Sequence, residues 1–289
     1  MRRTLVLAAT AALLLVVWAP VWSAHLIAGS TNGVIRDVDT SVPGESLRYN
    51  IGFGVTGLAV DDANGILYAS GGGAAWNALS IFDLATGVEL IGSGARFVPA
   101  GFVDVYGLEF LYDETGTGRL FSIGYQDGKN YLIEYSLGAG GEAVDVKSAL
   151  PVVDTSGAQP LHMAHAAGLA FNTATGKFES NQSNNLYWEF GFTGEGTVLG
   201  GLGLSGVNGL GLGEDGIVYS LSAGSATSVA VFSLGAAGHQ IAIATNAQVG
   251  NGWAMSGAKT PRMTVIPEPS TLLLLAGCGL LSLLRRRRR

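Results

Sequence analysis

Five short segments repeat one pattern, a glycine followed by alternating apolar residues, and this repetition constrains the fold more than any other feature. Successive segments begin 41 to 61 residues apart. Repeats of this length are typical of architectures in which similar units pack together to bury a shared core. The segments are Gly57-Leu58-Ala59-Val60, Gly107-Leu108-Glu109-Phe110, Gly168-Leu169-Ala170-Phe171, Gly209-Leu210-Gly211-Leu212 and Gly252-Trp253-Ala254-Met255.

A polar turn and two further strand-like stretches follow each of the first four segments. Turns such as Asp61-Asp62-Ala63-Asn64-Gly65 contain residues that adopt the left-handed or hydrogen-bonded conformations of hairpins. None has the Asp-x-Asp-x-Asp-Gly spacing of a calcium loop, so hairpin geometry accounts for them. Each repeat therefore predicts one antiparallel sheet.

Units of three or four short strands predict an all-β fold, with a single β-propeller in residues 25–257. A β-sandwich is the alternative, because many short alternating strands are common to both architectures. The sequence has no WD dipeptide or other blade signature, so it resembles propellers as an architecture and not a named propeller family.

The two ends of the repeat region complement each other. Residues 26–30 and 34–38 are similar to second and third strands without a first strand. The segment at Gly252 is similar to a first strand without the others. We expect the N-terminal strands to join this C-terminal strand in one blade, which closes the ring, removes open sheet edges and gives five blades.

Residues 267–289 contain three blocks in fixed order: Pro267-Glu268-Pro269, an apolar stretch from Thr271 to Leu284, and five arginines from Arg285 to Arg289. As a helix, the apolar stretch would span roughly 21 Å, less than the ~30 Å hydrocarbon core, so it predicts a short and marginal membrane helix. The arginines favour the cytoplasmic side, which places Pro267-Glu268-Pro269 at the outer face. A buried core helix is the alternative, and the terminal run of like charges argues against it.

This tail resembles the PEP-CTERM sorting signal, over about two dozen residues. The resemblance implies a protein exported by a Gram-negative bacterium, held transiently in the inner membrane, and processed by an exosortase near Pro267, Glu268 and Pro269. The association of such systems with exopolysaccharide and biofilm production implies a cell-surface or extracellular protein. Residues 258–266 are expected to form a polar, non-helical linker to the tail.

Residues 1–23 predict a secretory signal peptide. Arg2 and Arg3 precede an apolar run from Leu5 to Val17, and Val21-Trp22-Ser23 ends in the small residue that signal peptidase requires. A retained N-terminal membrane helix is the alternative. In both cases the middle of the chain is exported.

The region between the two ends is acidic. It has nine Lys or Arg residues against twenty-one Asp or Glu residues once the seven arginines of the ends and Glu268 are set aside. Nucleic acid is therefore not an expected partner, because phosphate backbones require a basic surface. Divalent cations and neutral or cationic polymers remain compatible with this charge. The one cysteine, Cys278, lies in the tail, so the exported region has no disulfide and no thiol nucleophile.

Common catalytic motifs are mostly absent from the sequence. No Gly-x-Ser-x-Gly elbow and no His-Glu-x-x-His occur. Residues 201–206 match Gly-x-Gly-x-x-Gly, but the helix that would hold a pyrophosphate does not follow. We therefore favour a non-enzymatic protein without catalytic residues and without a cofactor, apart from the cation considered next.

Residues near the start of each inner strand are expected to converge at the mouth of the propeller channel. Asp104, His165, Asn208 and Asn251 offer oxygen and nitrogen atoms there, and they form a candidate site for a divalent metal ion or a sugar. The alternative is a water-filled channel capped by polar residues. Thr56 and Tyr106 precede the repeat glycines of the first two blades and are expected at the same mouth.

Two functions follow from these observations. The first is a non-catalytic surface or matrix protein that contacts extracellular polysaccharide. The second is an exported polysaccharide hydrolase or lyase with its site at the channel mouth. The sequence favours the first, because most acidic residues fall in turns or on strands without a convergent partner.

Overall fold

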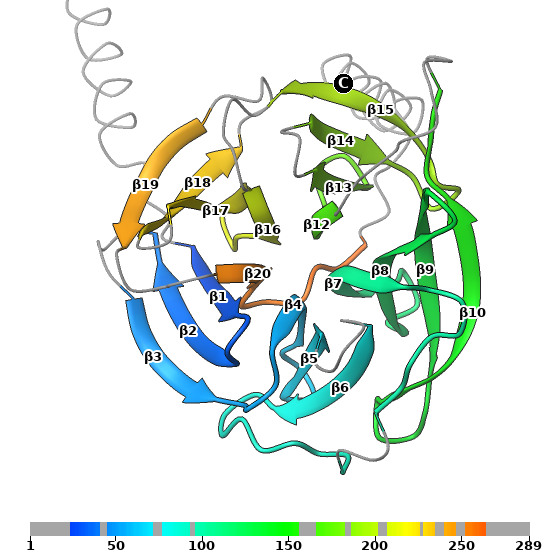
Figure 1. Cartoon of the computed structure of the whole chain (residues 1–289), viewed down its shortest axis with the longest axis horizontal. Coiled ribbons are helices and arrows are strands. Elements are labelled where there is room, and N and C mark those ends of the chain that lie inside the picture. Colours follow the sequence, from blue (N-terminus) through cyan, green and yellow to red (C-terminus); the bar gives the residue numbers. More distant parts are fainter. Residues whose placement is uncertain are drawn as a thin grey trace, which may run out of the picture.

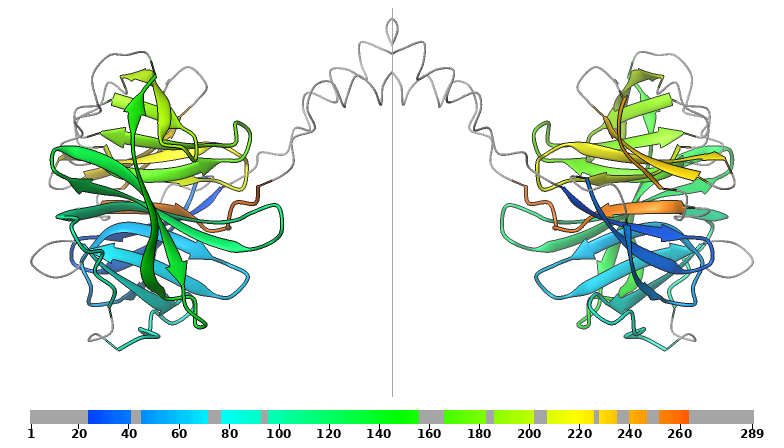
Figure 2. Two further views of the ribbon diagram at one scale, coloured as in Figure 1. Left: turned by 90° about the vertical axis from the view of Figure 1, so that its right-hand side faces the viewer. Right: turned by 90° about the vertical axis from the view of Figure 1, so that its left-hand side faces the viewer.

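Five β-sheets surround a common axis in the computed structural model of the chain (Figure 1). The structure describes residues 24–40, 45–71, 77–92, 96–155, 166–182, 186–201, 207–225, 228–234, 240–246 and 252–263. All elements within these ranges are strands and turns, which confirms the all-β prediction. Figure 2 shows the sheets from two sides.

The sheets are formed mainly from strands that follow one another in the chain. The first contains β20 (Gly252–Gly257), β1 (His25–Ser30), β2 (Val34–Asp39) and β3 (Glu45–Asn50). The second contains β4 (Val55–Asp61), β5 (Ile66–Gly71) and β6 (Ala78–Asp83). The third contains β7 (Asp104–Tyr112), β8 (Gly118–Gln126), β9 (Lys129–Leu137) and β10 (Ala143–Pro151).

The remaining two sheets follow in the second half of the chain. The fourth contains β12 (Ala166–Asn172), β13 (Lys177–Gln182), β14 (Leu186–Phe190), β15 (Glu195–Gly201) and the short β11 (Val153–Asp154), which pairs parallel to β15. The fifth contains β16 (Val207–Leu212), β17 (Val218–Ser225), β18 (Ser228–Leu234) and β19 (Gln240–Asn246).

The first strand of each repeat lies closest to the axis. These inner strands contact one another in a closed cycle, from β4 to β7, β12, β16, β20 and back to β4. In Figure 1 the other strands of each sheet lie progressively farther from the centre. This radial arrangement is that of a β-propeller, and it excludes the β-sandwich, in which two sheets face each other.

The expectation of five blades needs correction. Four sheets have four or more strands, whereas the sheet β4–β5–β6 has three. Within the described residues, the outer edge of β6 is met only by isolated bridges, Leu79 with Phe97 and Phe82 with Glu89. Among the described residues a regular fourth strand does not form there, so four blades are complete and the second sheet has only three strands.

The predicted closure of the ring is confirmed. β1 pairs antiparallel with β20, with Leu26 opposite Gly257 and Ala28 opposite Met255. The N-terminal strands thus supply the outer part of a sheet whose inner strand comes from the C-terminal end. The incomplete repeats at the two ends of the region thus combine into one sheet, and neither β1 nor β20 is left as an unpaired strand.

Among the described residues the apolar core is divided into five clusters, one in each wedge between adjacent sheets. Between the second and third sheets, Tyr68, Leu79, Leu108 and Phe110 pack together. Between the first and second sheets, Ile27, Leu58 and Phe82 are among the residues that pack. The other three wedges are filled in the same manner by residues such as Phe171 and Phe178, Tyr187 and Leu210, and Leu26 and Tyr219.

The turns after the first four inner strands confirm the predicted hairpins. The glycine that ends each turn has a positive φ of 68 to 81°, at Gly65, Gly116, Gly176 and Gly216. Residues with a Cβ atom adopt this region only at an energetic cost, so glycine at these positions fixes where each hairpin reverses.

The repeat glycines lie where neighbouring inner strands approach closely. A Cβ atom at Gly57 would lie 2.9 Å from the backbone nitrogen of Leu108, and one at Gly168 would lie 2.6 Å from that of Leu210. The equivalent contact of Gly209 is with the nitrogen of Met255, at 2.6 Å. Ala254 and Met255 therefore take the place of the last repeat's glycine and second residue, so the predicted register, which began at Gly252, is wrong by two residues.

Substitution of Gly57 by alanine is expected to lower the free energy of unfolding by about 1–3 kcal/mol, because its Cβ atom would overlap the backbone of β7. Gly92→Ala is the control, since a Cβ atom at Gly92 would have no heavy atom within 4 Å. The control is expected to change stability by less than about 0.5 kcal/mol. Urea denaturation of the full-length chain measures both, and equal stabilities of the two variants would contradict the close approach.

Candidate functional site

The predicted site at the channel mouth is only partly visible in the structure. Asp104 begins β7, opposite Tyr125 of β8, and Asn208 lies in β16 with its side chain outside the described residues. His165 and Asn251 also lie outside the described residues. β7 and β16 are separated by β12 in the ring, so Asp104 and Asn208 are not brought together on adjacent strands. The metal or sugar site at this mouth stays a prediction.

Two residues expected at the mouth are instead buried between sheets. Thr56 and Tyr106 have 4% and 9% of their surface exposed. The Thr56 hydroxyl donates a hydrogen bond of 3.0 Å to the carbonyl oxygen of Val105, which links β4 to β7. The reason is that the backbone pairing shifts at Thr56, between Val55 and Gly57, and turns its side chain into the wedge.

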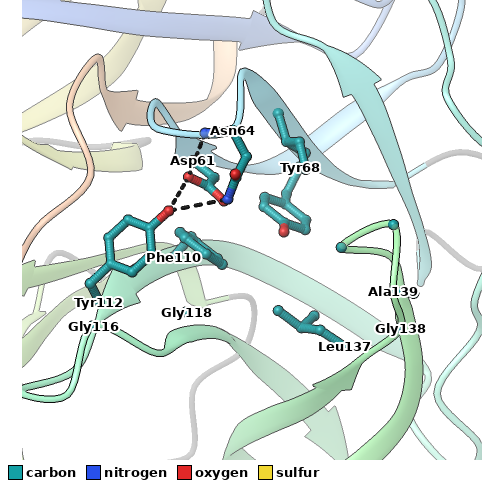
Figure 3. A pocket seen from close by; sticks show the side chains of 13 residues that line it. Asp61, Asn64, Tyr68, Phe110, Tyr112, Gly116, Gly118, Leu137, Gly138 and Ala139 are labelled. Carbon is teal, nitrogen blue, oxygen red and sulfur yellow. Dashed lines mark hydrogen bonds between the residues drawn. The ribbon is translucent and has the colours of Figure 1, made fainter.

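A cavity of about 430 Å³ lies at the opposite end of the inner strands, between the second and third sheets. Its residues come from the end of β4, from β5, from the hairpin of β7 and β8, and from the loop at 138–141. This volume is within the range of small-molecule binding sites. Figure 3 shows the cavity with the side chains that line it.

Aromatic rings form one part of the cavity wall. The Tyr68 and Phe110 rings are stacked, with centroids 5.2 Å apart and planes 15° apart. The Tyr112 ring meets Phe110 edge-on, at 5.4 Å and 87°. In Figure 3 the Tyr68 hydroxyl points into the cavity. Burial, followed by the charge of Asp61, raises the pKa of Tyr68, so this hydroxyl stays protonated and can donate a hydrogen bond.

A buried carboxylate anchors the polar part of the wall. Asp61, 2% exposed, accepts a 2.6 Å hydrogen bond from the Tyr112 hydroxyl. It also accepts bonds from the backbone and side-chain nitrogens of Asn64, at 3.2 and 2.7 Å. The bond to the backbone of Asn64 is the turn role predicted from the sequence, and the bond to Tyr112 joins this turn to the next sheet.

The sequence interpretation missed this cavity. It assigned Asp61 and Tyr112 to hairpin turns and Tyr68 to a second strand, and it gave none of the three a role in binding. The available signal was the position of two tyrosines beside glycine-rich loops, at the same end of neighbouring repeats. The alternation of apolar and polar residues within one repeat does not indicate which side chains of two neighbouring sheets face each other.

Residues 260–263, within the predicted linker 258–266, pack beside the cavity. Thr260 donates a 2.8 Å hydrogen bond to the carbonyl oxygen of Val60 and exchanges bonds with Asp62. The backbone of Tyr112 pairs with Pro261 and Met263, and the Arg262 guanidinium lies 4.7 Å from the Tyr112 ring centroid. We call residues 260–263 the exit segment. It is fixed to the ends of β4 and β7, and residues 264–266 lie outside the described residues.

Glu109 is a second buried acid, on the inner strand β7. It is 5% exposed, and its Oε2 atom accepts a 2.9 Å hydrogen bond from the backbone N–H of Phe171 on β12. Burial raises the pKa of Glu109 to about 8. Burial likewise raises the pKa of Glu179, on β13, to about 7. Glu109 bridges two inner strands and does not line the cavity.

Within the described ranges, no three His, Cys, Asp or Glu side chains gather into a group that would hold a metal ion. The same ranges contain no helix with the length and hydropathy needed to cross a bilayer. The predicted signal peptide and C-terminal helix lie outside these ranges.

The comparison with protein families confirms the predicted sorting signal. Residues 265–289 match the PEP-CTERM protein-sorting motif. The motif implies export, processing by an exosortase and transient anchoring in a membrane. No curated protein matches the chain in sequence.

Two solved structures are similar to the chain in fold. One is the β-propeller domain of Cps50 (Swd1) from Myceliophteria thermophila, with 15% identity, a TM-score of 0.42, and coverage of 73% of this chain and 62% of that one. The other is the PQQ-bound form of aldose sugar dehydrogenase (Adh) from Streptomyces coelicolor, with 15% identity, a TM-score of 0.42, and coverage of 61% and 58%. The chain spans less than two thirds of the length of either, and likenesses this distant carry no inference about its ligand or activity.

The raised pKa of Glu109 predicts how stability depends on pH. In the folded protein the Glu109 carboxyl keeps its proton up to about pH 8, whereas in the unfolded chain it ionises near its ordinary pKa of 4.5. The folded state therefore binds more protons between these values, and stability falls as pH rises through this window. In Glu109→Gln, the loss between pH 5 and 8 is expected to be smaller by roughly 2–4 kcal/mol.

Urea denaturation of the full-length chain across this pH range measures the effect. Glu179 contributes a remaining slope of the same sign, because its pKa is also raised. The exposed Glu195, changed to Gln, is the control and is expected to leave the slope as it is. An unchanged slope in Glu109→Gln would show that Glu109 is ionised in the folded protein.

Proposed function

We propose that the chain is an exported, non-catalytic protein that binds extracellular polysaccharide at the cavity between the second and third sheets. The single observation that supports this most is the pairing of aromatic walls with hydrogen-bonding groups in one cavity. Tyr68 and Phe110 supply the rings, and the Tyr68 hydroxyl and Asn64 supply polar atoms. Such a combination is typical of sites for small polar ligands.

Sugars match this chemistry because each ring has an apolar C–H face and a polar rim. The C–H face packs against an aromatic ring, and the hydroxyls exchange hydrogen bonds with protein groups. The Tyr68 hydroxyl both donates and accepts. The loop at 138–141 lies along the same wall.

The bonding of Asp61 favours binding over hydrolysis. A glycoside hydrolase requires one carboxylate that gives a proton and a second that attacks or activates water. Both oxygens of Asp61 already accept hydrogen bonds, from Tyr112 and Asn64. A carboxylate held in this way is an ordered structural acceptor and not a general acid. The alternative, a polysaccharide hydrolase or lyase, is tested by the product assay below.

The destination that we propose is the cell surface or extracellular matrix, with a role in exopolysaccharide or biofilm. The sorting motif supports export and exosortase processing. Removal of residues 1–23 by signal peptidase and the final location are parts of this proposal. The net negative charge of the exported region supports a polysaccharide partner more than a nucleic acid.

Binding is tested with a panel of soluble oligosaccharides and the full-length chain in mild detergent. Tyr68→Phe removes the hydroxyl that faces the cavity and keeps the buried ring. We expect this variant to bind roughly 5- to 10-fold more weakly, the effect of one lost hydrogen bond, with little change in melting temperature. Affinity is measured by titration calorimetry, with Tyr219→Phe as a matched change in another wedge. New reducing ends or unsaturated products would favour the enzyme instead.

Processing is tested by mass spectrometry of the protein released from its native host. We expect the mature protein to end near Pro267, Glu268 and Pro269, because the sorting motif begins at residue 265. A chain with Pro267→Ala and Pro269→Ala is expected to keep its tail in the membrane fraction. Detection of Arg285 to Arg289 in the mature surface protein would contradict exosortase processing.

A further inference from the structure

The cavity has a negative electrostatic character that polysaccharide binding in general does not require. Among the described residues that line it, Asp61 is the one charged residue, and none is Lys or Arg. Arg262 contacts the Tyr112 ring but does not line the cavity. A positive ligand group would therefore meet no like charge within the described wall.

A second carboxylate packs directly behind this wall. Glu142 follows the loop at 138–141, whose residues all line the cavity. A Cβ atom at Gly138 would lie 2.5 Å from its Oε1 atom, and one at Gly140 would lie 2.9 Å from its Oε2 atom. The carboxylate thus lies against two glycines that line the cavity, although Glu142 itself does not line it.

One oxygen of this carboxylate has no partner. Glu142 Oε2 is buried and makes no hydrogen bond in the structure. A buried and unpaired carboxylate oxygen costs free energy, whereas a positive charge brought close to it recovers part of that cost. Burial first, and then the charges of Asp61 and Glu142 among others, raise the pKa of Tyr68.

We propose that the ligand of this cavity is a sugar that carries a protonated amine, and that Glu142 determines this specificity. The proposal rests on the proposed function and names its ligand class. The ammonium group would lie near the loop at 138–141, between the Glu142 carboxylate and the Tyr68 ring. An aromatic face attracts a cation through its quadrupole, so Tyr68 and Phe110 favour the ammonium as well as the sugar ring.

Three trimers with the same β-1,4 backbone test this proposal. They are a glucosamine trimer, which is cationic, an N-acetylglucosamine trimer and a glucose trimer, which are neutral. The titrations are made at about pH 6, where the amines of the glucosamine trimer are protonated. Titration calorimetry with the full-length chain is expected to give at least about 10-fold tighter binding of the glucosamine trimer, a preference that falls as salt increases.

The Glu142→Gln variant separates charge from shape. It is expected to reduce the preference for the glucosamine trimer to within about 3-fold, while the affinity for the glucose trimer stays within about 2-fold of the original. Glu195→Gln, an equal charge change at an exposed residue of β15, is the control and is expected to keep the preference. Melting temperatures of all three proteins establish that they are folded.

Each outcome decides between the two proposals. If none of the trimers binds, the proposed function fails at this cavity. If the neutral trimers bind as tightly as the glucosamine trimer, polysaccharide binding stands and the inference about the amine is overturned. The same conclusion follows if Glu142→Gln keeps the full preference.

Discussion

The pairing of β1 with β20 is the interaction on which the whole architecture depends. It joins residues more than two hundred positions apart, with Leu26 opposite Gly257. Without it, β20 would have no partner in its own sheet, and the wedges on both sides of that sheet would lose one wall. Because the core consists of five separate wedges, each cluster is stable only while the ring holds its two sheets together.

Polar side chains stabilise the inside of the ring where backbone pairing ends. An inner strand pairs with one neighbour, so its other edge has free N–H and C=O groups. Thr56 donates to the carbonyl oxygen of Val105, and Glu109 accepts from the N–H of Phe171. Both contacts join strands of adjacent sheets. The buried acid at position 109 thus has a structural role, at the cost of a pKa far from that of a free carboxyl.

Sequence patterns predicted the features that each repeat specifies locally. Glycines such as Gly65 and Gly116 mark the hairpins because the backbone there has positive φ. The complementary ends predicted the closure, because strands of opposite type were missing from each. The register of the last strand was missed because Ala254 is small enough to stand where the other repeats have glycine. The contact of Asp61 with Tyr112 joins two sheets, and spacing within a single repeat holds no information about it.

The exit segment has a consequence for the orientation of the molecule. It leaves the ring beside Tyr112, at the rim of the cavity, and Met263 is four residues before Pro267. Four extended residues reach at most about 14 Å. In the anchored state proposed above, with Pro267 at the outer face of the membrane, the end of the ring that carries the cavity would lie within this distance of the lipid headgroups, and a long polymer would have little room to approach it. Cleavage of the tail would release the protein from the membrane and let this face turn outward. The ligand would then reach the cavity only after cleavage.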